Sequence, residues 1–276
     1  MNEFSQWIGR TEEHRDRISQ AGVDQFRATF DLDPASDNPG EAPKGYHWCL
    51  GLPDTPTPEL GLDGHPPKGG FLPPIPFPRR MWAASSVEFL TELPIGAQVV
   101  RRSKIFSVQE KTGKSGPLVL VQVEHQTEVE GQCAIKERQT IVYREQATSA
   151  MELPPVEKPQ SFQYPLLREV LPTQTLLFRY SALTFNSHRI HYDLPYAMEQ
   201  EGYPGLVVHG PLMASLGVQA AAAHGDLKTF SFRALSPAFC DQPLYVVGDF
   251  DKDTQEVNVL GGDGRRCVSA QVTFKQ

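Results

Sequence analysis

Hydrophobic and polar residues alternate in two regions of the chain, and this pattern predicts an antiparallel sheet in each region. The runs are rich in Val and Ile, and short turns such as Glu130-Gly131 separate them. An antiparallel sheet needs a cover on one face, so each region should also contain an apolar helix. The predicted strands are residues 98–109, 118–129, 134–144, 175–184, 229–234, 244–251, 256–260 and 267–274.

Each region contains one predicted helix. Residues 11–30 carry an apolar stripe, with charges in the first turns. Residues 211–224 are almost uncharged and mostly small, with Gly210 at the predicted N-cap and Gly225 just past the end. A helix that is apolar on nearly all sides is buried, and small side chains let a sheet curl closely around it.

Two segments lack any such periodicity. Residues 53–78 contain nine prolines, which exclude a continuous helix or strand, yet they also contain Phe71 and Ile75. We expect an ordered loop laid over a surface, because a disordered linker would be poorer in large apolar residues. Residues 146–165 contain four prolines and are predicted to link two domains, residues 1–145 and 166–276.

Composition narrows the classes of function. The formal net charge of −7 argues against a nucleic-acid-binding surface, which needs clustered Lys and Arg. No apolar run approaches the ~20 residues that span a bilayer. The four cysteines are scattered without a CxxC pair, and the first residues lack the pattern of a signal peptide. We therefore expect a cytoplasmic protein with no nucleic-acid or membrane partner.

Polar residues gather directly after the predicted strand 175–184. His191 is the natural general acid or base there, because the unperturbed pKa of histidine lies near neutrality. Asn186 offers a donor and an acceptor, so it can orient a water molecule but cannot take its proton. The group comprises Asn186, His188, Arg189, His191 and Asp193.

Several of these residues have alternative interpretations. Isolated histidines in loops are often structural. Asp193 precedes Leu194-Pro195-Tyr196, a plausible helix start, and is predicted to be its N-cap. Arg189 could bind a substrate carboxylate or phosphate, or could pair with Asp193 or Glu199. Zinc ligation is a further, less favoured alternative, because the HxxH spacing suits one helical face poorly. Its ligands would be His188, His191, Asp193 and His209.

The second motif is His209-Gly210 at the start of the predicted buried helix. A helix N-terminus carries free N–H groups and a partial positive charge. The N–H of Gly210 or of Leu212 could therefore bind a thioester oxygen as it becomes an enolate, whereas Pro211 has no N–H. The same residues could serve only as a helix cap, but capping and oxyanion binding are compatible.

These two motifs resemble those of the MaoC-like hotdog hydratases and dehydratases. The family motif runs from an aromatic residue to Gly-Asp-x-Asn-Pro-Ile-His, and residues 180–191 here read YSALTFNSHRIH. Ile190 and His191 match, whereas Asn186 stands where the family has its catalytic Asp. Phe185, His188 and Arg189 replace the family's Gly, Asn and Pro. Together with the segments YHWCLGLP and PIPFPRRMWA, FNSHRIHYD resembles the itaconyl-CoA and mesaconyl-CoA hydratases, relatives of the hydroxyacyl-thioester dehydratases type 2.

The resemblance implies an α+β double hotdog, in which each half wraps an antiparallel sheet around a central helix. It implies that only the second half is catalytic and that the first half shapes an acyl-CoA pocket, with the proline-rich loop over the substrate. No cofactor is implied, because coenzyme A is part of the substrate. Hotdog sheets commonly pair, so a homodimer is possible.

The implied reaction is hydration of a branched dicarboxylic enoyl-CoA to citramalyl-CoA. In this reading His191 activates water, Asn186 orients it, and the Gly210 N–H binds the thioester oxygen. The substrate's free carboxylate needs a cation, for which the candidates are Arg189, Arg79 and Arg80. The remaining residues expected to bind substrate are His188, His209 and Leu212. The competing hypotheses are a dehydratase or R-specific hydratase of acyl-carrier-protein or straight-chain thioesters, and a non-catalytic hotdog binding module.

Overall fold

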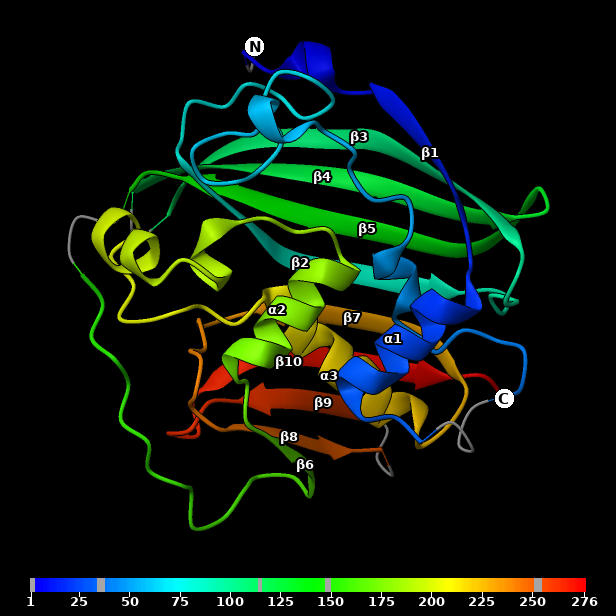
Figure 1. Cartoon of the computed structure of the whole chain (residues 1–276), viewed down its shortest axis with the longest axis vertical. Helices are drawn as coiled ribbons and strands as arrows, with labels where there is room; N and C mark the ends of the chain where they lie inside the picture. The colour runs from blue at the N-terminus through cyan, green and yellow to red at the C-terminus, as the bar shows by residue number, and fades with distance from the viewer. Residues whose placement is uncertain (1–2, 34–37, 114–115, 147–149, 251–254) are drawn as a thin grey trace.

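A single ten-stranded sheet forms the framework of the protein (Figure 1). The computed structural model describes residues 3–33, 38–113, 116–146, 150–250 and 255–276. The strand order is β1-β3-β4-β5-β2-β7-β10-β9-β8-β6, and all neighbouring strands pair antiparallel. The strands are β1 (Thr11–Arg17), β2 (Arg79–Phe89), β3 (Gln98–Gly113), β4 (Gly116–Val129), β5 (Gln132–Arg144), β6 (Leu166–Val170), β7 (Leu227–Ala234), β8 (Leu244–Asp249), β9 (Gln255–Leu260) and β10 (Arg266–Phe274).

The sheet has two halves that are consecutive in sequence. Strands β1 to β5 form one half and β6 to β10 the other, and β2 pairs with β7 at the joint. There Ser86 Oγ lies 2.8 Å from Ser231 Oγ. Among the described residues of the predicted linker, 146 and 150–165, no helix or strand is present, and residues 147–149 lie outside the described part. The division into two domains stays a prediction.

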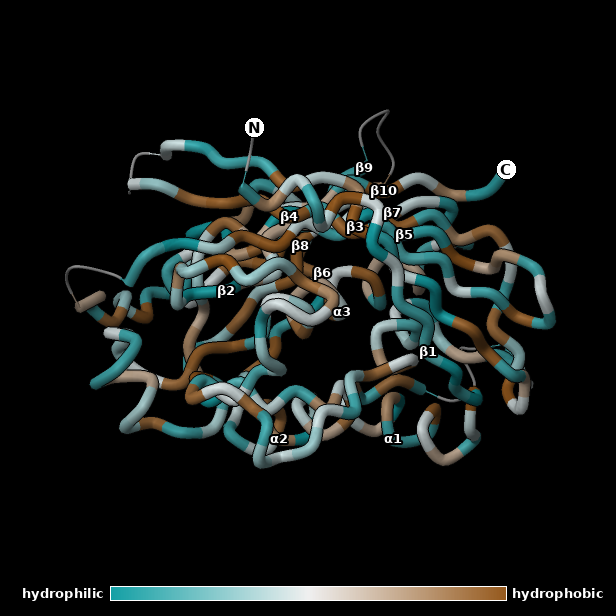
Figure 2. Tube along the Cα trace, turned by 90° about the horizontal axis from the view of Figure 1, so that it is seen from above, coloured by the Kyte–Doolittle hydropathy of each residue, from teal (hydrophilic) through white to brown (hydrophobic). Residues whose placement is uncertain are grey.

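Helix α3 (Gly210–Ala222) lies on the concave side of the sheet, as Figure 2 shows from above. It contacts β7, β8, β9, β10 and the end of β2. A Cβ added at Gly217 would already touch Phe230 and Val257, at 3.4 and 3.6 Å, so the small residues of the helix permit close packing. The predicted buried helix and the predicted α+β class are confirmed, but the N-cap is His209 rather than Gly210.

Residues 11–30 form a strand and a helix rather than one helix. β1 pairs with β3 at the edge of the sheet, and its side chains alternate between exposed and half-buried. Helix α1 (Gln20–Phe30) begins only after Ser19, whose hydroxyl accepts a hydrogen bond from the Gly22 N–H. The apolar stripe predicted the helix correctly, while sheet pairing determined the conformation of the charged residues before it.

Residues 175–184 were predicted as a strand, and this prediction is wrong. They belong to helix α2 (Gln174–Leu183), which is capped by the Thr173 hydroxyl and packs against α1. Leu177 and Tyr180 are buried at helical spacing, and Phe30 of α1 meets Tyr180 edge-on. The aromatic and apolar composition suggested a strand, but packing against α1 favours the helical period.

The other predicted strands are confirmed within a few residues, except that residue 251 lies outside the described part. Strands β2 and β6 were missed. β2 follows the proline-rich segment directly and contains Ala84, Ser85 and Ser86, which have little strand propensity. β6 has only five residues, too few for a clear alternation.

The proline-rich segment is ordered and lies against β3, β4 and β5, as Figure 1 shows for the cyan loop. Ile75 is fully buried there with Ile105, Val121 and Tyr143. This agrees with the expected surface-covering loop. Of the helices that the structure describes, none has the length and apolar character needed to cross a membrane.

Candidate active site

The loop between α2 and α3 begins with a residue in a left-handed backbone conformation. Phe185 has φ 47° and an exposed side chain, and the Asn186 N–H donates to the Ser181 carbonyl at 2.9 Å. Most residues avoid this region of φ, whereas glycine enters it freely. The MaoC-like motif has glycine at this position, so the turn is retained here despite the substitution.

Asn186 shapes the loop through its side chain. Its Oδ1 accepts a hydrogen bond from the His188 N–H at 3.0 Å, which is an Asx turn. The next residues form a short 3-10 turn, Arg189–His191. The amide carbonyl of Asn186 is thus engaged with the backbone. The Nδ2 donors of the amide remain the part of the side chain that suits the predicted role of orienting water.

His191 is buried and has a defined tautomer. Its Nδ1 lies 2.7 Å from the Val207 carbonyl oxygen, which can only accept, so Nδ1 carries the hydrogen and Nε2 has a free lone pair. The Val207 N–H in turn donates to the Ile190 carbonyl at 3.0 Å, which joins the loop to the segment before α3. Burial lowers the pKa of His191 to about 4. At neutral pH the ring is therefore an uncharged base.

His209 lies directly against His191. The two rings stack with centroids 3.6 Å apart, and His209 is fully buried. His209 Nε2 lies 2.8 Å from the Ser181 hydroxyl of α2, whereas its Nδ1 is buried without a hydrogen-bond partner among the described residues. Burial and the neighbouring histidines hold the pKa of His209 well below its usual value. The His209 ring packs against one face of the His191 ring and is inaccessible to substrate in this conformation.

The stack places His191 beside the N-terminus of α3. Gly210 and Leu212 lie in the first turn, where N–H groups have no partner within the helix. A side chain at Gly210 would meet only the Trp82 carbonyl oxygen at 3.6 Å, so the glycine leaves open space there. Leu212 itself is fully buried in the core. The structure thus brings a neutral imidazole base and a helix N-terminus together, as the sequence predicted.

Asp193 and Arg189 form an ion pair within the loop. Arg189 Nη2 and Nε lie 2.7 and 2.9 Å from Asp193 Oδ2, and its guanidinium stacks 4.2 Å from the Tyr196 ring. Asp193 Oδ1 also accepts a hydrogen bond from the Tyr196 N–H at 3.1 Å, as a capping side chain does, although the N-cap of the turn Tyr196–Gln200 is Pro195 rather than Asp193. Of the two alternatives for Arg189, pairing with Asp193 is the one present.

The zinc alternative requires His188, His191, Asp193 and His209 to converge, and they do not. Asp193 is engaged with Arg189 and Tyr196, and the faces of His191 and His209 lie against each other. Ring nitrogens bind metals through lone pairs in the plane of the ring, so stacked rings do not aim both at one ion.

The sequence and the fold both match known proteins. Residues 45–240 match the family model described as hydroxyacyl-thioester dehydratase type 2. The chain is 43% identical over 276 residues to a mesaconyl-C(4)-CoA hydratase of Chloroflexus aurantiacus, with 96% of each chain covered. The chain belongs to the hydroxyacyl-thioester dehydratase type 2 family. It is therefore a hydro-lyase, as the motifs predicted.

A more distant relative and several solved structures are similar to this chain. The mitochondrial hydroxyacyl-thioester dehydratase type 2 of Schizosaccharomyces pombe is 29% identical over 267 residues, covering 84% of this chain and 88% of the relative. The solved structure of HtdX of Mycobacterium tuberculosis has a TM-score of 0.71 at 17% identity, covering 96% and 100% of the two chains. A MaoC-like dehydratase of Phytophthora capsici has a TM-score of 0.73 at 15% identity, covering 97% and 96%. A further solved structure, Rv0216 of Mycobacterium tuberculosis, described as a double hotdog fold, has a TM-score of 0.61 at 10% identity, covering 96% and 95% of the two chains. The double hotdog fold is thus confirmed.

Within this dehydratase-type chain, the arginines predicted to bind a carboxylate differ in availability. Arg79 is buried, with Nε 2.8 Å from Glu201 Oε2 and Nη2 3.0 Å from the Glu201 carbonyl. Arg80 is half-buried, donates a long 3.4 Å hydrogen bond to the Pro66 carbonyl, also interacts with the Tyr143 hydroxyl, and has no carboxylate partner among the described residues. Burial is the main cause that lowers the pKa of both His65 and His188, and the charge of Arg80 lowers both further. Arg80 is therefore the candidate cation closest to the histidines that is not already neutralised.

The proline-rich loop contributes residues to the site that the sequence did not reveal. The Arg189 N–H donates to the Asp63 carbonyl at 2.9 Å, and the Ser187 hydroxyl donates to the Gly64 carbonyl at 2.5 Å. Gly64 has φ 85°, and a Cβ there would lie 1.9 Å from the Ser187 carbonyl oxygen. Only glycine permits this approach. The available signal was Asp63-Gly64-His65, a carboxylate and a histidine around a glycine in a long ordered loop.

Proposed function

We propose that this hydro-lyase adds water to the double bond of a branched dicarboxylic enoyl-CoA, mesaconyl-CoA or itaconyl-CoA, to give citramalyl-CoA. The observation that carries the proposal is the neutral base His191, with a free Nε2, held beside the open N-terminus of α3. The 43% identity to a protein named mesaconyl-C(4)-CoA hydratase supports the choice of acyl group and of coenzyme A.

The reaction follows from the placement of these groups. His191 Nε2 removes a proton from water, and the oxygen attacks the β-carbon of the conjugated thioester. The electron pair of the double bond moves toward the thioester oxygen. This oxygen accepts a hydrogen bond from the Gly210 N–H at the positive end of α3. Asn186 Nδ2 orients the water for attack on the β-carbon. A proton then reaches the α-carbon, and the hydroxyacyl thioester leaves.

Arg80 is the residue that we assign to the free carboxylate of the substrate. A buried carboxylate needs a hydrogen-bonded cation, and arginine can bind both of its oxygens. Arg79 and Arg189 already have carboxylate partners, whereas Arg80 faces the histidine cluster without one among the described residues. Selection of a dicarboxylic substrate over a straight-chain one would therefore depend on Arg80.

A second candidate function is dehydration or hydration of thioesters on acyl carrier protein, or of straight-chain acyl-CoA. The 29% identity to the mitochondrial hydroxyacyl-thioester dehydratase type 2 of S. pombe favours it. The net charge of −7 weighs mildly against an acidic carrier protein as partner.

A panel of thioesters separates the two functions. Purified protein would be assayed spectrophotometrically with mesaconyl-CoA, itaconyl-CoA and crotonyl-CoA, and with crotonyl thioester on carrier protein. We expect kcat/KM to be highest with a dicarboxylic acyl-CoA. A preference for either crotonyl thioester would replace the first function by the second.

A further inference from the structure

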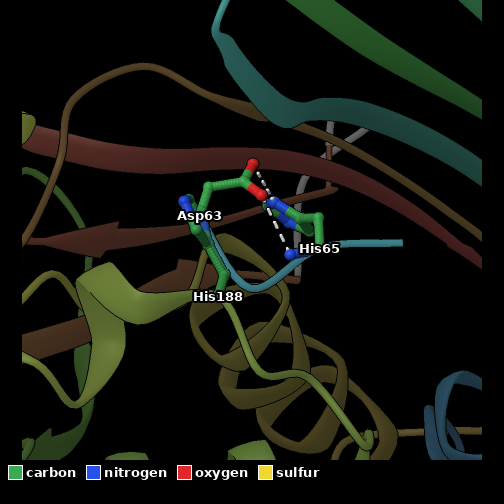
Figure 3. A group of neighbouring side chains, drawn as sticks. All are labelled: Asp63, His65 and His188. Carbon is green, nitrogen blue, oxygen red and sulfur yellow. Dashed lines mark hydrogen bonds and ion pairs between the residues drawn. The ribbon is translucent and has the colours of Figure 1, made fainter. Parts of the chain in front are cut away.

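The part of the proline-rich loop that is hydrogen-bonded to the catalytic loop contains a carboxylate–imidazole pair, Asp63 and His65 (Figure 3). Asp63 Oδ2 lies 2.8 Å from His65 Nδ1, and Asp63 Oδ1 accepts from the His65 N–H at 3.0 Å. Since a carboxylate accepts, the hydrogen sits on Nδ1 and Nε2 is the free end of the ring. Two hydrogen bonds therefore determine both the tautomer and the orientation of His65.

His65 is the first of four histidine rings in successive contact, a row that ends with His209 at the N-terminus of α3. The His65 ring lies 4.1 Å from that of His188, and His188 meets His191 edge-on at 5.4 Å. His191 in turn stacks on His209. Four imidazoles from the proline-rich loop, the catalytic loop and the helix N-cap are thus in contact, and neither His65 nor its carboxylate has a role in the reaction as described above.

One of the four rings, His65, has a partner that favours a proton, although burial lowers the pKa of His65 below its usual value. Among the described residues, His65 is the only member of the row with a carboxylate within ion-pair distance. His191 has the neutral Val207 carbonyl and His209 the neutral Ser181 hydroxyl as partners. An adjacent carboxylate stabilises an imidazolium, whereas burial next to other histidines opposes it. The two rings therefore differ in their partners: the Asp63 carboxylate favours a proton on His65, whereas His191 has a neutral partner and stays a base.

We propose that Asp63 and His65 form a second catalytic dyad, in which His65 delivers the proton to the α-carbon while His191 takes a proton from the attacking water. The proposal rests on the function proposed above. It supplies from the first half of the chain the carboxylate that the family has at position 186, where this chain has asparagine.

The step balances as follows. One O–H bond of water breaks and its proton goes to His191 Nε2, while the oxygen forms a bond to the β-carbon. The electron pair of the double bond moves to the thioester oxygen and then forms the Cα–H bond with the proton from His65 Nε2. His191 ends protonated and His65 neutral, and exchange of one proton with solvent restores both. Burial opposes the protonated form of His65 most strongly and lowers its pKa, and Arg80 opposes it as well, whereas Asp63 favours it. The other titratable group against His65 is the His188 ring.

The same side chains could instead surround a metal ion, since ligand atoms of Asp63, His65 and His188 lie within 4.8 Å of one another. The geometry favours the dyad. The His65 and His188 rings face each other with planes inclined by 37°, and the Asp63 carboxylate is occupied by two N–H groups of His65. A metal would require the lone pairs to point at one position.

The test compares His65→Gln and Asp63→Asn with wild type, using whichever enoyl-CoA the wild type hydrates. Gln keeps a hydrogen-bond donor for Asp63 but cannot transfer a proton. We expect His65→Gln to lower kcat by about 10²- to 10³-fold, in the range of general acid catalysis, with KM changed less than about threefold. Asp63→Asn should lower kcat by roughly tenfold, because the imidazolium loses its counter-charge.

The pH profile distinguishes chemistry from loop positioning. Protonated His65 is lost as pH rises, so wild-type kcat should fall on the alkaline side. Asp63→Asn should move this fall to lower pH, and His65→Gln should abolish it. His14→Gln is the matched control, since His14 pairs with Glu12 on β1 at 3.7 Å, outside the site. An increase in KM with unchanged kcat and pH profile in both variants would overturn the dyad and leave only a docking role.

Two further results would be decisive. One zinc ion per chain by elemental analysis of the wild type, with activity lost on chelation and restored by zinc, would replace the dyad by a metal site. Normal turnover of His65→Gln alongside an inactive His191→Ala would overturn the dyad and leave the proposed function intact. A wild type that hydrates none of the thioesters would instead refute the proposed function.

Discussion

The concave face of the sheet is covered differently in its two halves. In the C-terminal half, α3 packs with small residues against β7 to β10 and presents its N-terminus beside His191 and His209. In the N-terminal half, the proline-rich loop covers β3 to β5 and sends residues 62–65 across to the catalytic loop. The helix provides neutral groups, and the loop with the adjoining β2 provides the charged ones, Asp63 and Arg80. In our account the first half is not a passive cover, because it supplies substrate selection and a proton.

Loss of the base His191 from the C-terminal half should have the largest effect on turnover. His191→Ala removes the only group that we assign to activate water, and we expect kcat to fall by about 10³-fold or more, the scale of general acid–base catalysis. Initial rates with mesaconyl-CoA would measure this. His14→Ala, remote from the site, should retain full activity. Near wild-type turnover of His191→Ala would show that the chemistry does not belong to this half.

Loss of the charge next to the loop should alter selectivity and leave the chemistry intact. Arg80→Met removes a charge-assisted hydrogen bond to the substrate carboxylate, and we expect kcat/KM for mesaconyl-CoA to fall about 30- to 300-fold. The value for crotonyl-CoA, which has no free carboxylate, should stay within about threefold.

The matched control is Arg233→Met, which makes the same chemical change at an exposed position of β7. If Arg80→Met reduced both substrates equally, Arg80 would have a structural role and the carboxylate would bind elsewhere.

Undocking the loop should have a moderate effect on stability. Gly64→Ala places a methyl group 1.9 Å from the Ser187 carbonyl oxygen at a residue with φ 85°, and we expect it to lower the free energy of unfolding by about 1–3 kcal/mol. Hydrogen exchange in residues 60–66 should also accelerate. Gly70→Ala in the same loop has no atom within 4 Å of the added Cβ and should be neutral. Equal effects of the two substitutions would contradict docking at Gly64.

Helix α3 and the proline-rich loop, which cover the two halves of the sheet, also differ in how far the sequence could predict them. Helix α3 is recognisable because its punctuation by Gly210, Pro211 and Gly225 and its small apolar body are local properties. His191, Asn186 and Gly210 could be predicted because each lies in a contiguous motif. The contribution of Asp63 and His65 could not, because it depends on contact across more than 120 positions with Ser187 and Arg189. Likewise, residues 174–183 form a helix that packs against α1, a contact between segments far apart in the sequence.

The difference in availability between Arg79 and Arg80 also depends on contacts with residues far away in the sequence. Arg79 and Arg80 are adjacent in sequence and identical in chemistry, but they alternate across β2, so one meets Glu201 and the other faces the histidines. The buried partner Glu201 lies 122 positions away. Nothing in the local sequence distinguishes the two residues.

The buried histidines should make the free energy of unfolding depend on pH. The pKa of His191 is about 4 when folded against 6.5 when unfolded, so only the unfolded chain binds this proton between those values. Stability should therefore fall as pH falls from 6.5 to 4, by about 1.4 kcal/mol per pH unit for each such histidine. His191→Ala should reduce this slope by one proton, as urea unfolding at pH 7, 6 and 5 would show. An unchanged slope would mean that His191 is not buried in its neutral form.

We propose above all that His191 and the charged groups beside it hydrate a dicarboxylic enoyl-CoA in preference to a straight-chain one. The most direct measurement is a competition in ¹⁸O-labelled water, with equal concentrations of mesaconyl-CoA and crotonyl-CoA and mass spectrometry of the products. We predict that heavy oxygen enters the hydroxyacyl product of mesaconyl-CoA at least about 30-fold faster, by the strength of the added carboxylate contact, and that His191→Ala forms neither product. Equal labelling of both products, or labelling that persists in His191→Ala, would contradict the claim.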